Sequence, residues 1–309
     1  TLYFIFFAIL SESVVSQKIF ATVTVRKDGK GNFSRISDAI AVAPENNNGD
    51  IGYFQISIKE GVYAEYLIIP SNKGYVMMTG AAAVGKRFFA RDITFRNTAG
   101  ANKAQAVALL STSDRSVFYR CSFEGFQDTL YVQSKLQFYR DCDVYGTVDF
   151  IFGNAAVIFQ NCNIYVRRTP TGTNTVTAQN KSNQNQTTGI IIHNSRVTAA
   201  TDLLPVLGST KTYLGRPWDK YSTTVFMKTY LDRLIDPRGW LEWNQTTDVS
   251  TLFYAEFQNK GPGASTSGLV TWPGFRILHS ASEASRFTVG TFLAGSSWIP
   301  PGVPFTSGL

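Results

Sequence analysis

The sequence has few charged residues and few of the side chains that most often carry enzymatic chemistry. Asp, Glu, Lys and Arg make up 17% of the 309 residues, and no run rich in Lys or Arg occurs, which disfavours nucleic acid as a partner. The two histidines, His193 and His279, lie outside every motif, and no Gly-x-Ser-x-Gly sequence is present. These absences argue against a Ser-His-Asp esterase, and both histidines are interpreted as structural.

Long apolar runs are also missing. The run at residues 2–10 has nine apolar residues, whereas a helix that crosses a bilayer needs about 20, so no membrane anchor is expected. The run and the small polar residues after it are typical of a secretory signal, and residues 1–16 are interpreted as its remnant, with a buried first strand as the alternative. Four Asn-x-Ser/Thr sequons, at Asn32, Asn180, Asn185 and Asn244, fit a secreted glycoprotein.

What the sequence does contain favours one large β domain over residues 17–309. Hydrophobic residues make up 44% of the chain and aromatic residues 14%, and there are 25 glycines, a composition typical of strands separated by turns. The net charge of +7 would attract a polyanion such as an acidic polysaccharide. We expect a monomer with no linker dividing it.

A repeated apolar pattern sets the expected architecture. Similar strand-and-turn segments occur at 88–95, 116–123, 138–144, 157–164 and 189–197, and three of them place a cysteine at the same point, 21 and then 20 residues apart. A period of this length is typical of stacked solenoid units. We therefore predict an all-β parallel β-helix, in which residues one coil apart lie above one another.

The three cysteines allow two arrangements. Stacking would bring Cys121 and Cys142 within reach of a disulfide, because bridged Cα atoms are usually about 5.5 Å apart, and secretion would permit the bond. Cys162 would then be left over. Alternatively, all three are small buried side chains in a stacked ladder, and the sequence leaves both arrangements open.

The two ends of the chain depart from the repeat. Apolar residues at positions 36, 39, 40 and 43 have the spacing of a short amphipathic helix that ends at Pro44 and would cap the open N-terminal end of the solenoid. From residue 281 onwards the repeat is lost and three prolines follow. We expect an irregular C-terminal tail packed along the outside.

Two aspartates are the leading candidates for catalysis. Asp128, in Gln-Asp-Thr-Leu, and Asp149, in Asp-Phe-Ile-Phe-Gly, lie in apolar surroundings 21 residues apart. This spacing is one coil, so their carboxyl groups should be neighbours. Two carboxyls in a partly apolar cleft do not both ionise readily, so the pKa of one should rise while that of the other stays low. The pair would then supply one acid and one nucleophile.

Further polar and aromatic residues recur at compatible positions. Gln105 precedes Gln127 by 22 residues, so two amide donors would stack beside the aspartates and stabilise an oxyanion. Arg216 and Trp218, in Leu-Gly-Arg-Pro-Trp, would point to the same side of an extended segment. The guanidinium would keep Asp149 ionised, and the indole would stack on a sugar ring. Taken singly, each residue also has a structural interpretation, such as a turn residue, an amide ladder or a surface ion pair.

Five segments together resemble plant pectin methylesterases and occur in the order that this family has them: 61–65 (Gly-Val-Tyr-Ala-Glu), 105–109 (Gln-Ala-Val-Ala-Leu), 127–130 (Gln-Asp-Thr-Leu), 149–153 (Asp-Phe-Ile-Phe-Gly) and 214–218 (Leu-Gly-Arg-Pro-Trp). The similarity extends from about residue 22 to the end of the chain. It implies a right-handed parallel β-helix with no metal or organic cofactor, secreted to the plant cell wall. The implied substrate is methyl-esterified pectin, and a proteinaceous pectin methylesterase inhibitor is an implied partner.

The same resemblance implies a covalent mechanism on a galacturonate methyl ester. The implied roles are nucleophile for Asp149, general acid and then base for Asp128, oxyanion stabilisers for Gln127 and Gln105, and groups that orient Asp149 and the substrate for Arg216 and Trp218.

One departure from the family lies between Gly80 and Ala81, where about one coil of residues is missing. In the family this stretch contains a threonine that contacts substrate, and no residue here takes that role. Two alternatives to an active esterase stay open: a pectin-binding homologue without turnover, and another β-helical pectin-acting enzyme, a lyase or galacturonan hydrolase. The stacked amide donors suit an acyl oxyanion better than the oxocarbenium ion of glycoside hydrolysis.

Overall fold

The computed structural model describes residues 18–309 except positions 48, 66, 80–86 and 244–247. The interpreted signal remnant at 1–16, the Gly80–Ala81 junction and the sequon at Asn244 lie outside the described residues. Within the described part of the chain, no helix combines the length and the apolar character that crossing a membrane requires.

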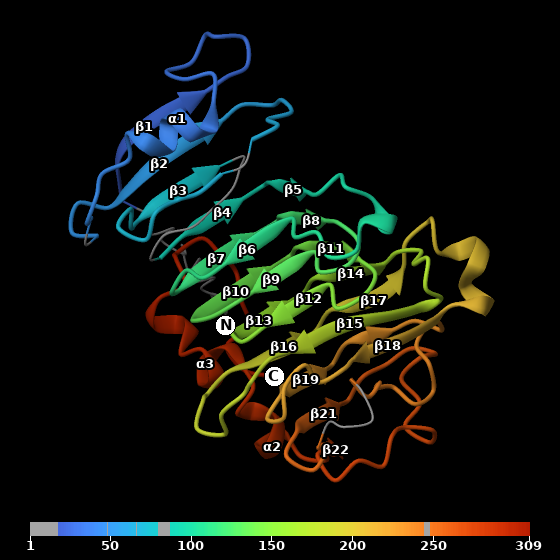
Figure 1. Ribbon diagram of the computed structural model, residues 1–309. Coiled ribbons are helices and arrows are strands. Elements are labelled where there is room, and N and C mark those ends of the chain that lie inside the picture. Colours follow the sequence, from blue (N-terminus) through green and yellow to red (C-terminus); the bar gives the residue numbers. More distant parts are fainter. Residues whose placement is uncertain (1–17, 48, 66, 80–86, 244–247) are drawn as a thin grey trace, which may run out of the picture.

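Three parallel sheets, called A, B and C, form the body of the protein, and successive strands visit them in that order (Figure 1). Sheet A has 11 strands, sheet B six and sheet C five. Neighbouring strands pair in parallel, in register from one coil to the next. The prediction of an all-β, right-handed parallel β-helix is confirmed.

The strands of sheet A are β1 (Ile19–Val25), β2 (Tyr53–Ile58), β3 (Val76–Thr79), β4 (Phe89–Arg91), β7 (Ser116–Tyr119), β10 (Leu136–Arg140), β13 (Ala156–Gln160), β16 (Gly189–His193), β19 (Thr223–Met227), β21 (Phe253–Phe257) and β22 (Phe275–Ile277). Those of sheet B are β5 (Thr94–Arg96), β8 (Ser122–Glu124), β11 (Asp143–Gly146), β14 (Asn163–Val166), β17 (Arg196–Ala199) and β20 (Tyr230–Leu231). Those of sheet C are β6 (Leu109–Ser111), β9 (Leu130–Val132), β12 (Ile151–Gly153), β15 (Thr173–Gln179) and β18 (Lys211–Gly215). The helices are α1 (Ile36–Ala41), α2 (Ala281–Ser285) and α3 (Val289–Phe292), with 3₁₀ turns η1 (Ala101–Lys103), η2 (Leu204–Ser209) and η3 (Gly295–Ser297).

Each repeated sequence segment forms one strand of sheet A and one of sheet B, joined by a two-residue corner. The first corner residue has a positive φ, as at Asp141 (52°), Asn161 (59°) and Asn194 (49°). Asn and Asp tolerate this left-handed conformation better than most residues because their short polar side chains bond locally. The second corner residue points into the solenoid, and at this position the chain has its three cysteines.

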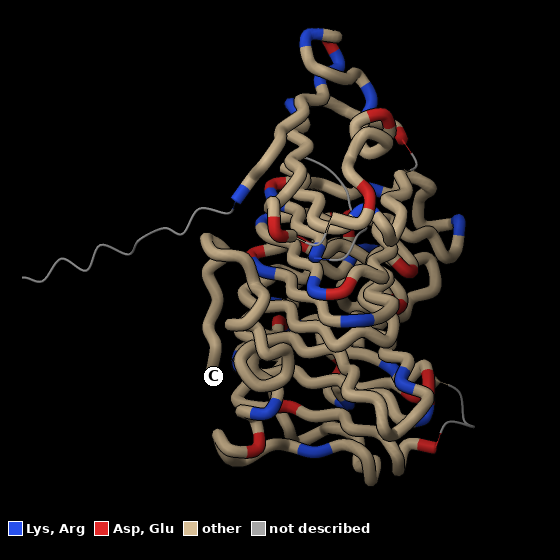
Figure 2. Tube along the Cα trace, turned by 90° about the vertical axis from the view of Figure 1, so that its left-hand side faces the viewer, with Lys and Arg blue, Asp and Glu red and all other residues tan. Residues whose placement is uncertain are grey.

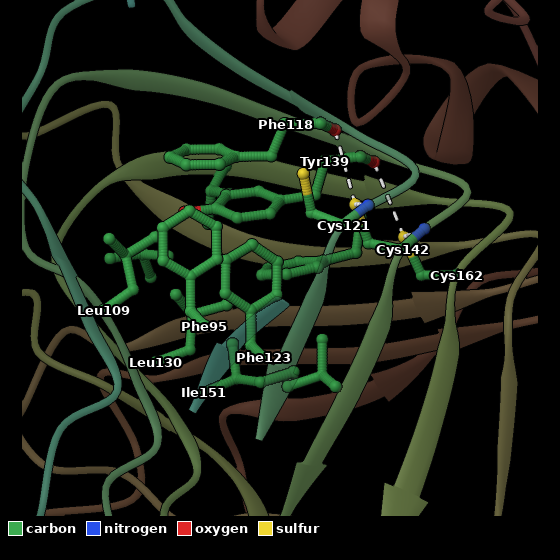
Figure 3. Close-up of a cluster of buried hydrophobic side chains, with 14 of the residues drawn as sticks. Phe95, Leu109, Phe118, Cys121, Phe123, Leu130, Tyr139, Cys142, Ile151 and Cys162 are labelled. Carbon is green, nitrogen blue, oxygen red and sulfur yellow. Dashed lines mark hydrogen bonds between the residues drawn. The ribbon is translucent and has the colours of Figure 1, made fainter. Parts of the chain in front are cut away.

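The cysteines form a ladder and not a bridge (Figure 3). All three are free and buried, so the predicted Cys121–Cys142 disulfide is not formed. Each sulfur is already engaged: Cys142 Sγ accepts the backbone N–H of Cys121 at 3.5 Å and donates to the carbonyl of Phe118 at 3.4 Å. The ladder continues through later coils, because the N–H of Cys162 donates to Ser195 Oγ at 3.0 Å. Burial raises the pKa of the Cys142 thiol.

Aromatic rings stack along the interior beside this ladder (Figure 3). Tyr139 lies between Phe118 and Phe159, with ring centroids 4.5 Å away on either side. Phe95 stacks on Phe123 at 5.2 Å. Equivalent positions in successive coils thus pack face to face, and this contact fixes the register of the coils above and below.

The N-terminal helix forms where the sequence predicted it. In α1 and just after it, Ile36, Ala39, Ile40 and Ala43 are all buried. No side chain of α1 itself caps its first turn; instead, the carboxylate of Glu65 accepts the backbone N–H groups of residues 36 and 37 at 2.9 and 3.0 Å. The family-like segment 61–65 therefore supports the capping helix.

The C-terminal tail packs along the outer face of sheet A, as expected, and Figure 2 shows its end running beside the solenoid. It is more regular than predicted, because it contains α2 and α3. A capping box formed by Ser280 and Glu283 starts α2, a local signal that the proline-based interpretation overlooked. The tail is tied to β13 by Gln160, whose amide bonds both the carbonyl and the N–H of Thr306 at 2.9 and 2.8 Å.

His193 is structural, as interpreted. It is buried on β16, where its Nδ1 lies 3.2 Å from the Gln160 amide. Burial lowers the pKa of His193 to about 4, with the charges of Lys228 and Arg140 acting in the same direction. His279 lies outside the site and donates its backbone N–H to Glu283 at the start of α2.

Candidate active site

Asp128 and Asp149 occupy equivalent positions in adjacent coils. Each lies two residues before a strand of sheet C, and the register pairs Leu130 of β9 with Ile151 of β12. Both aspartates have a positive φ, 60° and 50°, and the N–H of Asp128 donates to the carbonyl of Val148 at 3.0 Å. The one-coil stacking expected from the 21-residue spacing is what the structure shows.

Asp149 is held by a bidentate ion pair. Arg216, directly after β18, donates Nε to Oδ1 at 2.9 Å and Nη2 to Oδ2 at 2.6 Å. Asp149 is only 5% exposed, so the guanidinium compensates a carboxylate that has lost most of its water. Arg216 is placed for this contact because its own N–H bonds the carbonyl of Thr177 at 3.0 Å, which extends the β15–β18 pairing by one residue.

A second partner of Asp149 is Thr175 of β15, which sequence analysis missed. Its hydroxyl donates to Oδ1 at 2.6 Å and accepts the backbone N–H of Asp149 at 2.9 Å. The register that pairs Thr177 with Ile151 places Thr175 level with Asp149 in the next coil. The spacing is 26 residues, not 21, because the connection before β15 is longer. The period therefore gave no signal for it.

Asp128 differs from its neighbour in protonation. Burial raises the pKa of Asp128 to about 7, the charge of Asp149 raises it further, and Arg216 opposes both. Near neutral pH the pair thus offers a carboxyl that can give up or take a proton beside a carboxylate held by a cation. Among the described residues, no group of three or more His, Cys, Asp or Glu side chains is arranged to hold a metal ion.

The two glutamines lie at the same end of sheet C. The N–H of Ala106 donates to the carbonyl of Gln127 at 3.1 Å, which places Gln105 beside Gln127 in the preceding coil. Gln105 is exposed and Gln127 half-buried. Neither side chain is hydrogen-bonded to Asp128 or Asp149, all four being described residues.

Four rings, here called the aromatic group, lie beside the ion pair: Tyr131, Phe152, Trp218 and Trp243. Trp218, 37% exposed, lies 6.0 Å from Phe152 and 6.3 Å from Trp243, measured between ring centroids. The guanidinium of Arg216 lies 4.2 Å from the centre of the Trp243 ring. Of the four, sequence analysis selected only Trp218. Tyr131 and Phe152 stack at 4.4 Å and are 21 residues apart, so the coil period could have found them; Trp243 left no such signal.

The glycines of two motifs permit close stacking around the site. A Cβ on Gly153 would lie 2.2 Å from the carbonyl oxygen of Val132 in the coil before, and Gly153 has φ 126°. A Cβ on Gly215 would lie 2.0 Å from Thr177 Oγ1. Only glycine allows the backbones to approach this closely without displacement, which explains these residues in the Asp149 and Arg216 motifs.

Comparison with known proteins agrees with this geometry. The family profile described as pectinesterase matches the chain over residues 22–83 and 80–296. The chain is 65% identical to the Arabidopsis thaliana protein "Probable pectinesterase/pectinesterase inhibitor 17" over 92% of this chain and 59% of that protein. It is 53% identical to "Pectinesterase 2" of Citrus sinensis over 94% of this chain and 61% of that protein. The chain thus spans about three fifths of the length of these relatives.

A solved structure shares the fold along nearly its whole length. The pectin methylesterase from carrot superposes with a TM-score of 0.88 at 45% sequence identity, covering 96% of this chain and 99% of the carrot chain. Matches of this extent, with the motifs in order on a common scaffold, identify the family. The chain belongs to the pectinesterase family.

Proposed function

We propose that this chain hydrolyses the methyl esters of galacturonate in pectin, producing pectate and methanol. The observation that carries the proposal is the pairing of Asp149, buried and held by Arg216, with Asp128 one coil before it, whose pKa is raised to about 7. One group is suited to attack and the other to transfer protons. The names of the plant and carrot relatives support pectin as the substrate.

In the first half-reaction, a carboxylate oxygen of Asp149 attacks the ester carbonyl carbon. The new O–C bond gives a tetrahedral oxyanion, and its collapse breaks the bond to the methoxy oxygen. Asp128, protonated at this stage, gives its proton to that oxygen, so methanol leaves as a neutral molecule. The galacturonyl group remains bound to Asp149 as an acid anhydride.

In the second half-reaction, the roles of Asp128 reverse. Its carboxylate takes a proton from water as the water oxygen attacks the galacturonyl carbon. The bond to Asp149 breaks, which frees the galacturonate carboxyl group and restores the Asp149 carboxylate. A pKa of about 7 suits a group that must be both acid and base within one cycle.

The remaining residues would bind and orient. Gln127 and Gln105, at the same end of sheet C, would turn their amide donors to the oxyanion once substrate is bound. Arg216 would keep Asp149 ionised, and Trp218 would offer its exposed face to a sugar ring. The net charge of +7 would favour approach of the anionic polysaccharide.

The location and partners belong to the same proposal. We place the protein outside the cell, in the plant cell wall, as a secreted glycosylated monomer. A proteinaceous pectin methylesterase inhibitor is a candidate partner, since the name of the Arabidopsis relative contains the words "pectinesterase inhibitor".

A pectin-binding protein without turnover is the second candidate, and one observation favours it. Met77 of β3 pairs with Phe89 of β4, only twelve positions later, whereas Phe89 pairs with Val117 in the next coil. The family profile also matches in two segments whose ends meet at residues 80–83. Both support the proposal that about one coil is missing at Gly80–Ala81. Inserting the corresponding Arabidopsis residues there should then improve turnover or the KM for pectin.

The deciding experiment measures methanol released from methylated pectin by the purified chain, by Asp149→Ala and by Asp143→Ala. Asp143 is an aspartate of β11 that bonds Asn163 on the outside of sheet B, away from the site, and serves as the matched control. We expect release by the native chain and Asp143→Ala only, with pectate binding by all three. New reducing or unsaturated ends would indicate a hydrolase or lyase. Native release no faster than that of Asp149→Ala, with binding intact, would leave the binding function.

A further inference from the structure

Thr175 makes two hydrogen bonds to one residue. Its hydroxyl donates to Oδ1 of Asp149 and accepts the backbone N–H of the same residue. The hydroxyl thus locks the carboxylate to its own main chain. Thr175 is 1% exposed, and a β-branched side chain has few rotamers in a strand, so the position of this oxygen is well defined.

The partners of the two carboxylate oxygens are unequal. A carboxylate oxygen has two lone-pair directions in its plane. On Oδ1 both are used, one by Thr175 at 2.6 Å and one by Arg216 Nε at 2.9 Å. On Oδ2 the short bond comes from Arg216 Nη2 at 2.6 Å, and Nε, shared with Oδ1, is 3.2 Å away. Oδ2 therefore keeps one lone pair that is not directed at a protein donor.

We propose that Thr175 is a positioning residue that makes Oδ2 of Asp149 the attacking oxygen. By filling the second lone pair of Oδ1 and fixing the rotation of the carboxylate, it presents the free lone pair of Oδ2 to the ester carbon. In the acylation step the Oδ2–C bond forms, the C–O bond to the methoxy group breaks, and the proton of Asp128 leaves with methanol. Oδ1 becomes the carbonyl oxygen of the anhydride and keeps the bond from Thr175.

This inference rests on the proposed esterase function and makes a separate demand of the chain. Arg216 alone would allow either oxygen to attack, because its fork binds both. Thr175 approaches from the neighbouring strand and contacts only one of them, so it breaks the symmetry. A positioning role of this kind acts on the chemical step and has little effect on substrate binding.

The test compares Thr175→Val with Thr177→Val. The two threonines are on the same strand and both buried, but the hydroxyl of Thr177 donates to the carbonyl of Leu214 at 2.9 Å and does not contact Asp149. We expect kcat to fall about 10- to 100-fold in Thr175→Val, the loss expected for one hydrogen bond to a charged group. KM should change little. Thr177→Val should lower the melting temperature and leave kcat near the native value.

Thr175→Ser provides the rescue, because it keeps the hydroxyl and removes only the methyl group, and its kcat should stay within a few fold of native. Equal kcat in the two valine variants would overturn the proposal. Crystal structures of the variants provide a readout that does not depend on turnover. The Asp149 carboxylate should rotate in Thr175→Val and keep its orientation in Thr177→Val; an unrotated carboxylate would refute the positioning role even if the native chain released no methanol.

Discussion

The coils that hold Asp128 and Asp149 use strands of all three sheets, whereas β1, β2 and β3 are joined to the rest through sheet A alone. In the three-sheet region the inward rings of Tyr139 and Phe159 are fully buried and stack on each other. In the N-terminal region the interior is closed by α1, and Val62 remains 88% exposed. The catalytic pair is thus in the part of the solenoid where equivalent positions are constrained on every side.

The difference shows how each region obtains its stability. Coils of three sheets are held by repeated contacts between equivalent residues. The N-terminal strands depend on a few particular contacts: Glu65 binds the start of α1, and Lys73 binds the carbonyls of Ala41 and Ala43 at its end, at 2.9 and 2.6 Å. A loss in the first region should be felt by the whole fold, and a loss in the second should stay local.

The largest expected effect comes from removing a stacked ring in the three-sheet region. Phe159→Ala should lower the free energy of unfolding by about 3–5 kcal/mol, because it leaves a cavity between Tyr139 and its neighbours. Phe54→Ala, the matched change in β2, should cost less, since Phe54 lies near the exposed N-terminal edge. Urea denaturation measures both. Equal losses would remove the distinction between the two regions.

A smaller loss is expected at the helix cap. Glu65→Ala removes the acceptor for two backbone N–H groups of α1 and should cost about 1–2 kcal/mol. Amide hydrogen exchange should speed up in α1 and in β1 and β2, which α1 contacts, while β9 and β12 keep their protection. Methanol release should be unchanged. Faster exchange throughout the solenoid would show that the two regions unfold as one unit.

Asp128 gives a pH-dependent effect of about 1 kcal/mol, allowing for solvent screening of a partly exposed group. Its pKa is raised from an ordinary value of 3.8 to about 7, so ionised Asp128 is less favourable in the folded state than in the unfolded one. Stability is therefore lost as pH rises above about 4, and the loss is complete above about 7. Asp128→Asn should be more stable than the native chain at pH 8 and equal to it at pH 3.5, as thermal melts at the two pH values would show. Native kcat should decline as pH rises through about 7.

The smallest effect is expected within the cysteine ladder. Cys162→Ser should change the free energy of unfolding by less than about 1 kcal/mol, because Ser195 already occupies the equivalent position in the next coil and accepts the N–H of Cys162. Cys162→Val, which removes the acceptor for the Cys142 N–H, should cost more. If serine were as harmful as valine, the ladder would depend on sulfur packing and not on hydrogen bonding.

Features tied to the coil period could be predicted from the sequence. The repeat correctly placed the strands of sheets A and B, and the 21-residue spacing correctly placed Asp128 beside Asp149. The contact between Arg216 and Asp149 was predicted from chemistry and is confirmed. These succeed because a constant period converts sequence distance directly into spatial neighbourhood.

Features that depend on irregular connections could not be predicted. Thr175 contacts Asp149 from a longer coil, and a threonine in a polar strand carries no mark of its own. The disulfide prediction failed because proximity alone does not show where a thiol points, and here the cysteines point inward and serve backbone amides. Likewise, Glu65 belonged to a family-like motif, but its function as a cap for α1 became visible only with the helix in place.

The two-residue corner between sheets A and B has a consequence for engineering. It has the same length in every coil from β4–β5 to β19–β20, whereas the connection between sheets B and C grows from four residues between β11 and β12 to eleven between β17 and β18. Strand alignment is therefore set on one edge of the prism, and length changes are absorbed on another, beside the aspartates. Loops on that edge could be exchanged between homologues to alter which polymer is accepted, without redesigning the scaffold that carries them.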